Sequence, residues 1–315
     1  MRRLLRILAW FMGAMLLAVA GIVAHANYLI GKYETETIEA HAPGRFLTIE
    51  GRQQHFLTVG DIHADPTGAP LMLIHGFIIS GHAELMPWAA EELGPHRALI
   101  LPDLMGYGFS QRDPVPGPWS APKSHARYLA RMLDQLGVGK VDIVGHSYGG
   151  AMAARFALDY PERVRKIVYL NPGLYVPKSK AEVVIEMPAG IGRALTYHFL
   201  GNGPYGFPAR ICANTAGCSA AWPARIRDST ETLRALIYYN RHSPVLEDLY
   251  DEIPRLQTPG LILWGQDDIF LPFEYAQRFS RDSHAALQVI TGAGHNSWLE
   301  KPGEVAQRTL AFLAP

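Results

Sequence analysis

The chain contains little cysteine and no excess of either charge. Only two of its 315 residues are cysteines, and 29 Lys and Arg balance 29 Asp and Glu. A neutral chain lacks the basic surface that binds polyanions, so we expect no nucleic-acid partner. No histidine lies at a metal-binding spacing from cysteines or carboxylates, and we expect neither a metal nor a cofactor. With no internal repeat or low-complexity tract, the length fits one large core, or one core with an inserted segment.

Charged residues are also missing from a long N-terminal stretch. No Asp, Glu, Lys or Arg falls between Arg6 and Lys32. As a helix, this apolar run can span the ~30 Å hydrocarbon layer, and the arginines before it favour a cytoplasmic N-terminus. We therefore predict a membrane anchor or signal peptide over residues 1–31. The run exceeds the ~7–15-residue core of a signal peptide, which favours an anchor, whereas Ala24-His-Ala26 resembles a cleavage site that would release a secreted protein. Either interpretation places the remainder outside the cytoplasm, in the periplasm or the extracellular space.

One stretch joins a short buried strand to a helix through Gly145-x-Ser147-x-Gly149. The β-branched run over residues 141–144 predicts the strand, and the small residues from 149 to 154 predict the start of the helix. A serine at such a sharp turn adopts a strained backbone conformation, which requires nearly side-chain-free neighbours. The turn raises Oγ above the sheet and directs the helix N-terminus toward developing negative charge. This pattern is typical of a nucleophile elbow.

Strands and helices alternate along most of the chain. A hairpin is expected over residues 45–59. Buried strands are expected over 71–74, 97–102, 141–144, 164–170, 260–264 and 287–290, and helices over 84–93 and 123–136 and after residues 149, 272 and 302. The alternation predicts an α/β fold with a doubly wound, mostly parallel sheet. Residues 172–243 instead combine helical segments with clustered aromatics and glycines, which predicts an inserted helical cap. The core would then comprise residues 32–171 and 244–315.

A serine hydroxyl becomes an effective nucleophile when a base removes its proton. Among 13 histidines, His295 stands out because it follows the last predicted strand and is approached through Gly292 and Gly294. The base in turn needs a carboxylate that fixes its tautomer and stabilises the imidazolium. Asp267 and Asp268 both follow a buried strand and are both candidates. The chain order of serine, acid and histidine is the order expected for such a fold.

These motifs resemble the α/β-hydrolase superfamily, and more closely its capped serine esterase, lipase and carbon–carbon-bond hydrolase branch. The resemblance selects Asp268 over Asp267, because the family's acid lies three residues after the glycine. Some members carry the acid after the preceding strand, where this chain has Asn171-Pro172 and no carboxylate. The motifs that carry the resemblance are His75-Gly76-Phe77, Gly145-His146-Ser147-Tyr148-Gly149, Gly265-x-x-Asp268-x-x-x-Pro272 and Gly294-His295.

The resemblance implies a Ser147-His295-Asp268 triad and an oxyanion hole formed by the backbone N–H groups of Phe77 and Tyr148, with Ile78 as a less favoured substitute for Phe77. Such donors act on charge that appears only in the transition state. It implies hydrolysis of carboxylic esters, on a small molecule or a lipid, through an acyl-enzyme. The alternatives are a carbon–carbon-bond hydrolase, a cofactor-free haloperoxidase and a catalytically silent binding protein. A serine nucleophile argues against haloalkane dehalogenases and epoxide hydrolases, which use a carboxylate.

Several other polar residues are expected to be structural. His146 should point away from the nucleophile, His75 should shape its loop by hydrogen bonding, and Asp103 should stabilise a turn. Cys212 and Cys218, both in the predicted cap, are a candidate disulfide because an exported protein folds in an oxidising compartment. No Cys/His constellation accompanies them, which argues against thiol catalysis.

Overall fold

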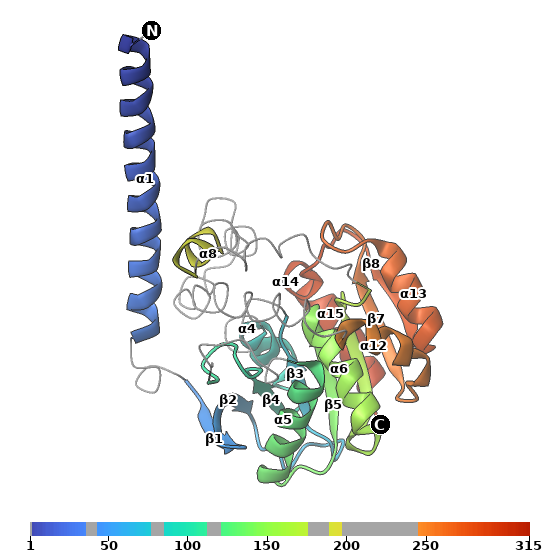
Figure 1. Ribbon diagram of the computed structural model, residues 1–315. Helices are drawn as coiled ribbons and strands as arrows, with labels where there is room; N and C mark the ends of the chain where they lie inside the picture. Colours follow the sequence, from blue (N-terminus) through green and yellow to red (C-terminus); the bar gives the residue numbers. More distant parts are fainter. Residues whose placement is uncertain (1, 36–42, 77–84, 112–120, 176–188, 197–244) are drawn as a thin grey trace.

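The structure is a computed structural model that describes residues 2–35, 43–76, 85–111, 121–175, 189–196 and 245–315. Its centre is an eight-stranded sheet in the order β1-β2-β4-β3-β5-β6-β7-β8 (Figure 1). β2 pairs antiparallel with β1 and β4, and every other pairing is parallel. The predicted mostly parallel α/β fold is therefore confirmed. The strands are β1 (Arg45–Ile49), β2 (Arg52–Val59), β3 (Leu71–Ile74), β4 (Leu99–Pro102), β5 (Val141–His146), β6 (Val164–Leu170), β7 (Gly260–Gly265) and β8 (Ala286–Ile290).

Helices cover both faces of the sheet, and each face has its own hydrophobic cluster. Met72 and Ile74 of β3 belong to the cluster that includes α5 and α6, whereas Leu71 and Leu73 belong to the one that includes α15. This division follows from the alternation of side chains along a strand. The helical segments are α1 (Arg2–Thr35), α4 (Met86–Trp88), the π-helix η1 (Ala89–Leu93), α5 (Pro122–Gln135), α6 (Tyr148–Asp159), η3 (Pro161–Arg163), α8 (Ala189–Thr196), α12 (Val245–Glu252), η7 (Ile253–Arg255), α13 (Phe273–Ser283), α14 (Ser297–Glu300) and α15 (Pro302–Leu313).

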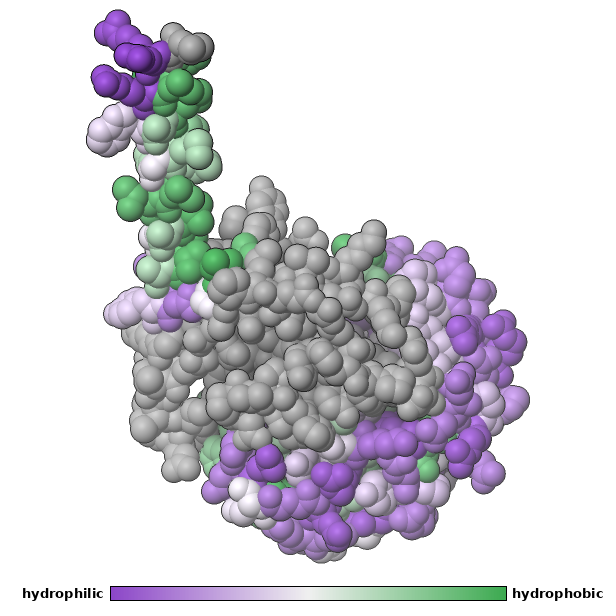
Figure 2. Space-filling view, viewed as in Figure 1, coloured by the Kyte–Doolittle hydropathy of each residue, from purple (hydrophilic) through white to green (hydrophobic). Residues whose placement is uncertain are grey.

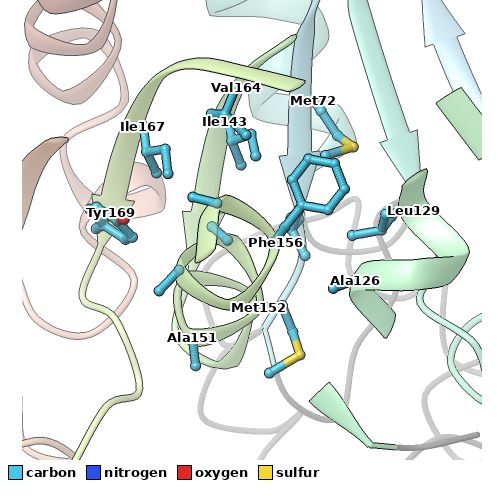
Figure 3. Close-up of a cluster of buried hydrophobic side chains, with 14 of the residues drawn as sticks. Met72, Ala126, Leu129, Ile143, Ala151, Met152, Phe156, Val164, Ile167 and Tyr169 are labelled. Carbon is cyan, nitrogen blue, oxygen red and sulfur yellow. The ribbon is translucent and has the colours of Figure 1, made fainter. Parts of the chain in front are cut away.

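Helix α6 is packed tightly against the centre of the sheet. Phe156 and Met152 lie between α6, the neighbouring α5 and the strands, and both are fully buried (Figure 3). Across the strands, Ile143 and Ile167 pair in register between β5 and β6. Burying an apolar side chain of this size stabilises the fold by about 1.5–3 kcal/mol. The helix that follows the predicted nucleophile therefore has little freedom to move.

Two predicted segments differ in detail from the structure. The helix expected over residues 84–93 consists of α4 followed by the π-helix η1, which ends at Leu93 and is capped by Gly94. Helix α1 extends past residue 31, the predicted end of the anchor segment, as far as Thr35. Of the predicted cap, the structure describes residues 172–175 and the helix α8. The remainder, including Cys212 and Cys218, lies outside the described residues, so the cap boundaries and the disulfide stay predictions.

Helix α1 projects from the body of the molecule, and Figure 2 shows apolar side chains along its projecting part. Residues Arg2–Leu29 are long and apolar enough to cross a membrane, a test that a signal peptide also passes. Large side chains such as Trp10 and Leu17 are exposed on it. Near its C-terminal end, Asn27 Nδ2 donates to the carbonyl oxygen of Gly190 in α8, at 2.8 Å. The end of α1 is thus attached to the part of the chain predicted as the cap.

Candidate active site

Ser147 lies on the turn between β5 and α6 in a strained backbone conformation. Its φ is 49° and its ψ is −118°, a region that a residue with a Cβ rarely occupies. The glycines on either side permit the turn because their backbones approach others closely. A Cβ on Gly145 would lie 2.5 Å from the carbonyl oxygen of Gly149, and a Cβ on Gly149 would overlap the carbonyl oxygen of Ile74. The local structure is that of the predicted nucleophile elbow.

Three side chains from distant parts of the sequence form a hydrogen-bonded chain. His295 Nε2 lies 3.0 Å from Ser147 Oγ, and His295 Nδ1 lies 2.7 Å from Asp268 Oδ2. Because a carboxylate only accepts hydrogen bonds, Nδ1 carries the proton and Nε2 presents its lone pair to the serine hydroxyl. The imidazole is only 7% exposed and the carboxylate 1%. The structure therefore brings together the three residues predicted from the sequence, in an arrangement suited to proton transfer from serine to imidazole.

The environment of Asp268 keeps its carboxylate charged. Burial raises its pKa, but the hydrogen bond and charge of His295, with the backbone N–H groups of Leu271 and Phe270, outweigh this effect and lower the pKa below its ordinary value. Oδ1 accepts both backbone N–H groups, at 2.8 Å from Phe270 and 3.0 Å from Leu271. Asp267, the other candidate left open by the residues themselves, is exposed. The geometry therefore favours Asp268 as the partner of His295.

The loops that carry the acid and the base are joined by their backbones. The N–H of Asp267 donates to the carbonyl oxygen of Ala293 at 2.8 Å. A Cβ on Gly265 would overlap the carbonyl oxygen of Gly294, so the two loops touch without an intervening side chain. The base loop is also held from the nucleophile side, where His146 Nε2 donates to the carbonyl oxygen of His295 at 3.1 Å. His146 thus supports the base loop, in agreement with the structural role predicted for it.

His75 and Asp103 shape neighbouring loops. Nε2 of His75 accepts the N–H of Leu104 at 3.0 Å, and its Nδ1–H donates to the carbonyl oxygen of Gly76 at 2.8 Å. Asp103 is fully buried, and its Oδ2 lies 2.8 Å from Nδ1 of His55. Burial raises the pKa of Asp103, but hydrogen bonding to and the charge of His55 lower it overall. Both residues have the structural contacts that the sequence pattern predicted.

The proposed oxyanion hole is described in part. Tyr148 is the first residue of α6, so its backbone N–H lies at the positive end of the helix dipole, next to Ser147. Phe77, predicted to supply the other donor, and its alternative Ile78 lie outside the described residues. Within the described ranges, no group of three or more His, Cys, Asp or Glu side chains is arranged to hold a metal ion. The oxyanion roles stay predictions.

Sequence patterns did not reveal the part played by Asn171. Its Nδ2 donates to Asp268 Oδ2 at 2.8 Å, while its Oδ1 accepts the Ser297 hydroxyl at 3.1 Å and the Gly265 N–H at 3.2 Å. A signal was present in the position of Asn171, directly after β6, where some members of the resembled family carry the acid. The sequence pattern itself indicates at this position only the lack of a carboxylate.

Comparison with known proteins agrees with this architecture. The alpha/beta hydrolase family model matches residues 71–308. The chain is 28% identical to a 2-hydroxy-6-oxo-6-phenylhexa-2,4-dienoate hydrolase from Burkholderia cepacia over 78% of this chain and 88% of that enzyme. It is 38% identical to a 2-hydroxy-6-oxo-2,4-heptadienoate hydrolase from Pseudomonas putida, over 35% of this chain and 40% of that enzyme.

Comparison with solved structures agrees with the sequence comparison. A thermophilic esterase from Thermogutta terrifontis is 25% identical, with a TM-score of 0.65 over 86% of this chain and 98% of the esterase. The family match extends over most of the sheet and includes the elbow, the acid and the base. The chain therefore belongs to the alpha/beta hydrolase family.

Proposed function

We propose that this protein is a serine hydrolase in which Ser147 attacks a carbonyl carbon, with His295 as the base and Asp268 as the group that orients it. The observation that carries the proposal is the continuous hydrogen-bonded chain from Ser147 Oγ through the imidazole to Asp268 Oδ2, with distances of 3.0 and 2.7 Å. A hydroxyl, an imidazole and a buried carboxylate in this order can transfer one proton from the nucleophile to the leaving group.

The reaction begins as the serine hydroxyl loses its proton to His295 Nε2 and Oγ bonds to the carbonyl carbon. Asp268 stabilises the imidazolium that forms. The backbone N–H groups of Tyr148 and Phe77 stabilise the negative oxygen of the tetrahedral intermediate, with each such donor contributing about 2.7–4 kcal/mol. The imidazolium then gives its proton to the departing group, leaving an acyl group on Ser147. A water molecule, deprotonated by His295, releases the acid and restores the serine.

The substrate class best supported by the relatives is a 2-hydroxy-6-oxo-dienoic acid, cleaved at a carbon–carbon bond. Enzymes of that name match this chain over as much as 78% of its length. A carbon leaving group departs with its electron pair, so the enol proton of the substrate first moves from the 2-hydroxyl oxygen to C5, which makes C2 a carbonyl conjugated through C3=C4 with the departing carbon. The fragment then leaves as a dienolate, whose oxygen takes up one proton. His295, protonated in the first step, would supply that proton. Water overall adds OH to the acyl fragment and H to the carbon fragment.

Carboxylic ester hydrolysis is the second candidate. It is supported by the similarity to an esterase at 25% identity and by the exposed apolar helix α1, which suits a protein working at a lipid surface. The same nucleophile, base and acid serve both reactions, because both begin with attack on a carbonyl carbon. With α1 as a membrane anchor or signal peptide, the catalytic part would lie outside the cytoplasm.

Activity assays on the full chain in detergent test both candidate reactions. We expect it to cleave 2-hydroxy-6-oxo-6-phenylhexa-2,4-dienoate into a carboxylic acid and a dienoate, with a larger kcat/KM than for p-nitrophenyl esters of graded length. The reverse order would support the ester hydrolase. Ser147→Ala should abolish both activities and labelling by a fluorophosphonate, whereas Ser283→Ala, at a buried serine bonded within α13, should abolish neither. A wild-type chain that is neither active nor labelled would refute the proposal and indicate a silent binding protein.

A further inference from the structure

The segment from Leu170 to Gly173 connects the nucleophile to the acid. We propose that Asn171 in this segment is a positioning residue, which fixes Asp268 through a hydrogen bond and so governs how well Asp268 stabilises the imidazolium of His295. This inference rests on the proposed function. It concerns a residue that belongs to neither the triad nor the predicted oxyanion hole.

The backbone of this segment is hydrogen-bonded to the nucleophile elbow. The N–H of Ser147 donates to the carbonyl oxygen of Leu170 at 2.9 Å, and the N–H of Gly173 donates to the carbonyl oxygen of Ser147 at 2.7 Å. The packing is close, since a Cβ on Gly150 would lie 2.7 Å from Cβ of Pro172. The position of this segment is therefore set by the same turn that carries the serine.

The side chain of Asn171 reaches the other way, to the acid and base loops. It is fully buried. Two donors converge on its Oδ1, the N–H of Gly265 and the hydroxyl of Ser297, and this fixes which end of the amide is oxygen. Its Nδ2 consequently faces Asp268 Oδ2 at 2.8 Å, the same oxygen that accepts from His295. The amide and the imidazole thus hold the same oxygen of the acid.

The chemistry of an amide suits this position. Asn171 donates an N–H to a charged acceptor without adding charge, and such hydrogen bonds are roughly twice as strong as those between neutral groups. A carboxylate here would face Asp268 with a like charge. The backbone favours asparagine as well, because φ at Asn171 is 42°, a left-handed conformation that asparagine tolerates better than most residues.

Loss of the amide should lower kcat more than it changes KM. The bond between Asp268 and His295 strengthens when the imidazole becomes charged, which happens in the transition state and not on substrate binding. In Asn171→Gly we expect kcat to fall about ten- to a hundredfold with KM changed less than about twofold. Glycine accepts the positive φ, so this variant should fold. Ser283→Ala is the control, since it removes a buried hydrogen bond to the carbonyl oxygen of Phe279 within α13 and should keep kcat within about twofold.

Asn171→Asp provides a second measurement, the pH dependence of kcat, which would not change if Asn171 had only a structural role. The introduced carboxyl keeps an acceptor for Gly265 and Ser297, and when protonated it can still donate to Asp268. Two adjacent carboxyls share one proton, so the pKa of one is strongly raised. As pH rises through that pKa the donor is lost, and we expect kcat of this variant to fall on the alkaline side where kcat of the wild type does not.

The experiment measures kcat and KM against pH for the full chain and the three variants, with active sites counted by fluorophosphonate labelling. An inactive wild type would refute the proposed function itself. With an active wild type, the role of Asn171 is refuted by Asn171→Gly at wild-type kcat, by Ser283→Ala losing as much kcat as Asn171→Gly, or by Asn171→Asp without an alkaline loss of kcat.

Discussion

The substitution Asp268→Asn should disable the catalytic chain while leaving its shape unchanged. Four N–H groups converge on the two oxygens of Asp268. Oδ2 accepts from His295 Nδ1 and Asn171 Nδ2, and Oδ1 accepts from the backbones of Phe270 and Leu271. Asparagine offers one oxygen and one NH₂ group at the same place. Whichever way the amide turns, two donors lose their acceptor and face an NH₂ group.

The orientation of the introduced amide that favours folding is also the orientation that impairs catalysis. If the oxygen stays with the two backbone N–H groups, the NH₂ group faces His295 and the imidazole takes the other tautomer, with its proton on Nε2. That nitrogen can then no longer accept the proton of Ser147. Replacing the acid of a Ser-His-Asp triad by its amide costs about 10⁴ in kcat, which corresponds to about 5.4 kcal/mol at 1.36 kcal/mol per decade.

The assay compares kcat of Asp268→Asn with that of Asp267→Asn on the best substrate. Asp267 is the adjacent acid and is exposed, whereas Asp268 Oδ2 lies 2.7 Å from the imidazole. We expect Asp267→Asn to keep kcat within about twofold, as a surface substitution usually does. The reasoning is refuted if Asp268→Asn stays within about tenfold of the wild type, or if Asp267→Asn is the variant that loses activity.

Two further predictions concern the surroundings of the triad. Gly149→Ala would place a Cβ against the carbonyl oxygen of Ile74 and should lower the free energy of unfolding, measured in urea, by about 1–3 kcal/mol or more. Gly139 has open space around it, so Gly139→Ala should lower this free energy by less than about 1 kcal/mol. Equal losses in the two variants would contradict the close approach at Gly149. Burial, aided by the charge of His75, lowers the pKa of His125 to about 3. His125 therefore binds a proton near pH 6.5 in the unfolded chain but not in the native chain. Between pH 7.5 and pH 5 the free energy of unfolding of the wild type should fall by about 2 kcal/mol for this reason, and His125→Phe should not show this fall. His63→Phe, a substitution at an exposed position, is the control for replacing a histidine by phenylalanine. A loss in His125→Phe as large as that of the wild type would contradict the lowered pKa.

Much of the sheet could be predicted from the sequence because its strands are short and buried. All four residues of Leu71–Ile74 are inaccessible to solvent, so both faces require apolar side chains and the run is continuous. The three residues of the hydrogen-bonded chain were also identifiable. Each follows a predicted strand at the edge of the sheet where the carboxyl ends of parallel strands meet, and the glycine pattern marks the turn at Ser147.

The role of Asn171 depends on strand pairing, which sequence patterns do not specify. β6 lies beside β7 with Leu170 opposite Leu263, and the N–H of Asn171 donates to the carbonyl oxygen of Leu263. This register alone places the Asn171 side chain beside the loop that carries Asp268. A shift of one residue would direct the amide to the opposite face of the sheet.

The motifs also left the reaction undecided for a chemical reason. The motifs predict ester hydrolysis, with carbon–carbon cleavage as an alternative, whereas the relatives favour that alternative. The elbow, the acid and the base serve the attack on a carbonyl, which the two reactions share. What distinguishes them is the group that leaves, and the groups that contact it are set by the substrate pocket, not by the three motifs.

The backbone contact between Gly265 and Gly294 has a consequence for redesign. Since no side chain separates the two turns, lengthening either one would displace its neighbour as well. A swap of active-site segments between members of this family would therefore have to transfer residues 265–272 and 292–297 together, as one cassette, for imidazole and carboxylate to arrive in mutual register.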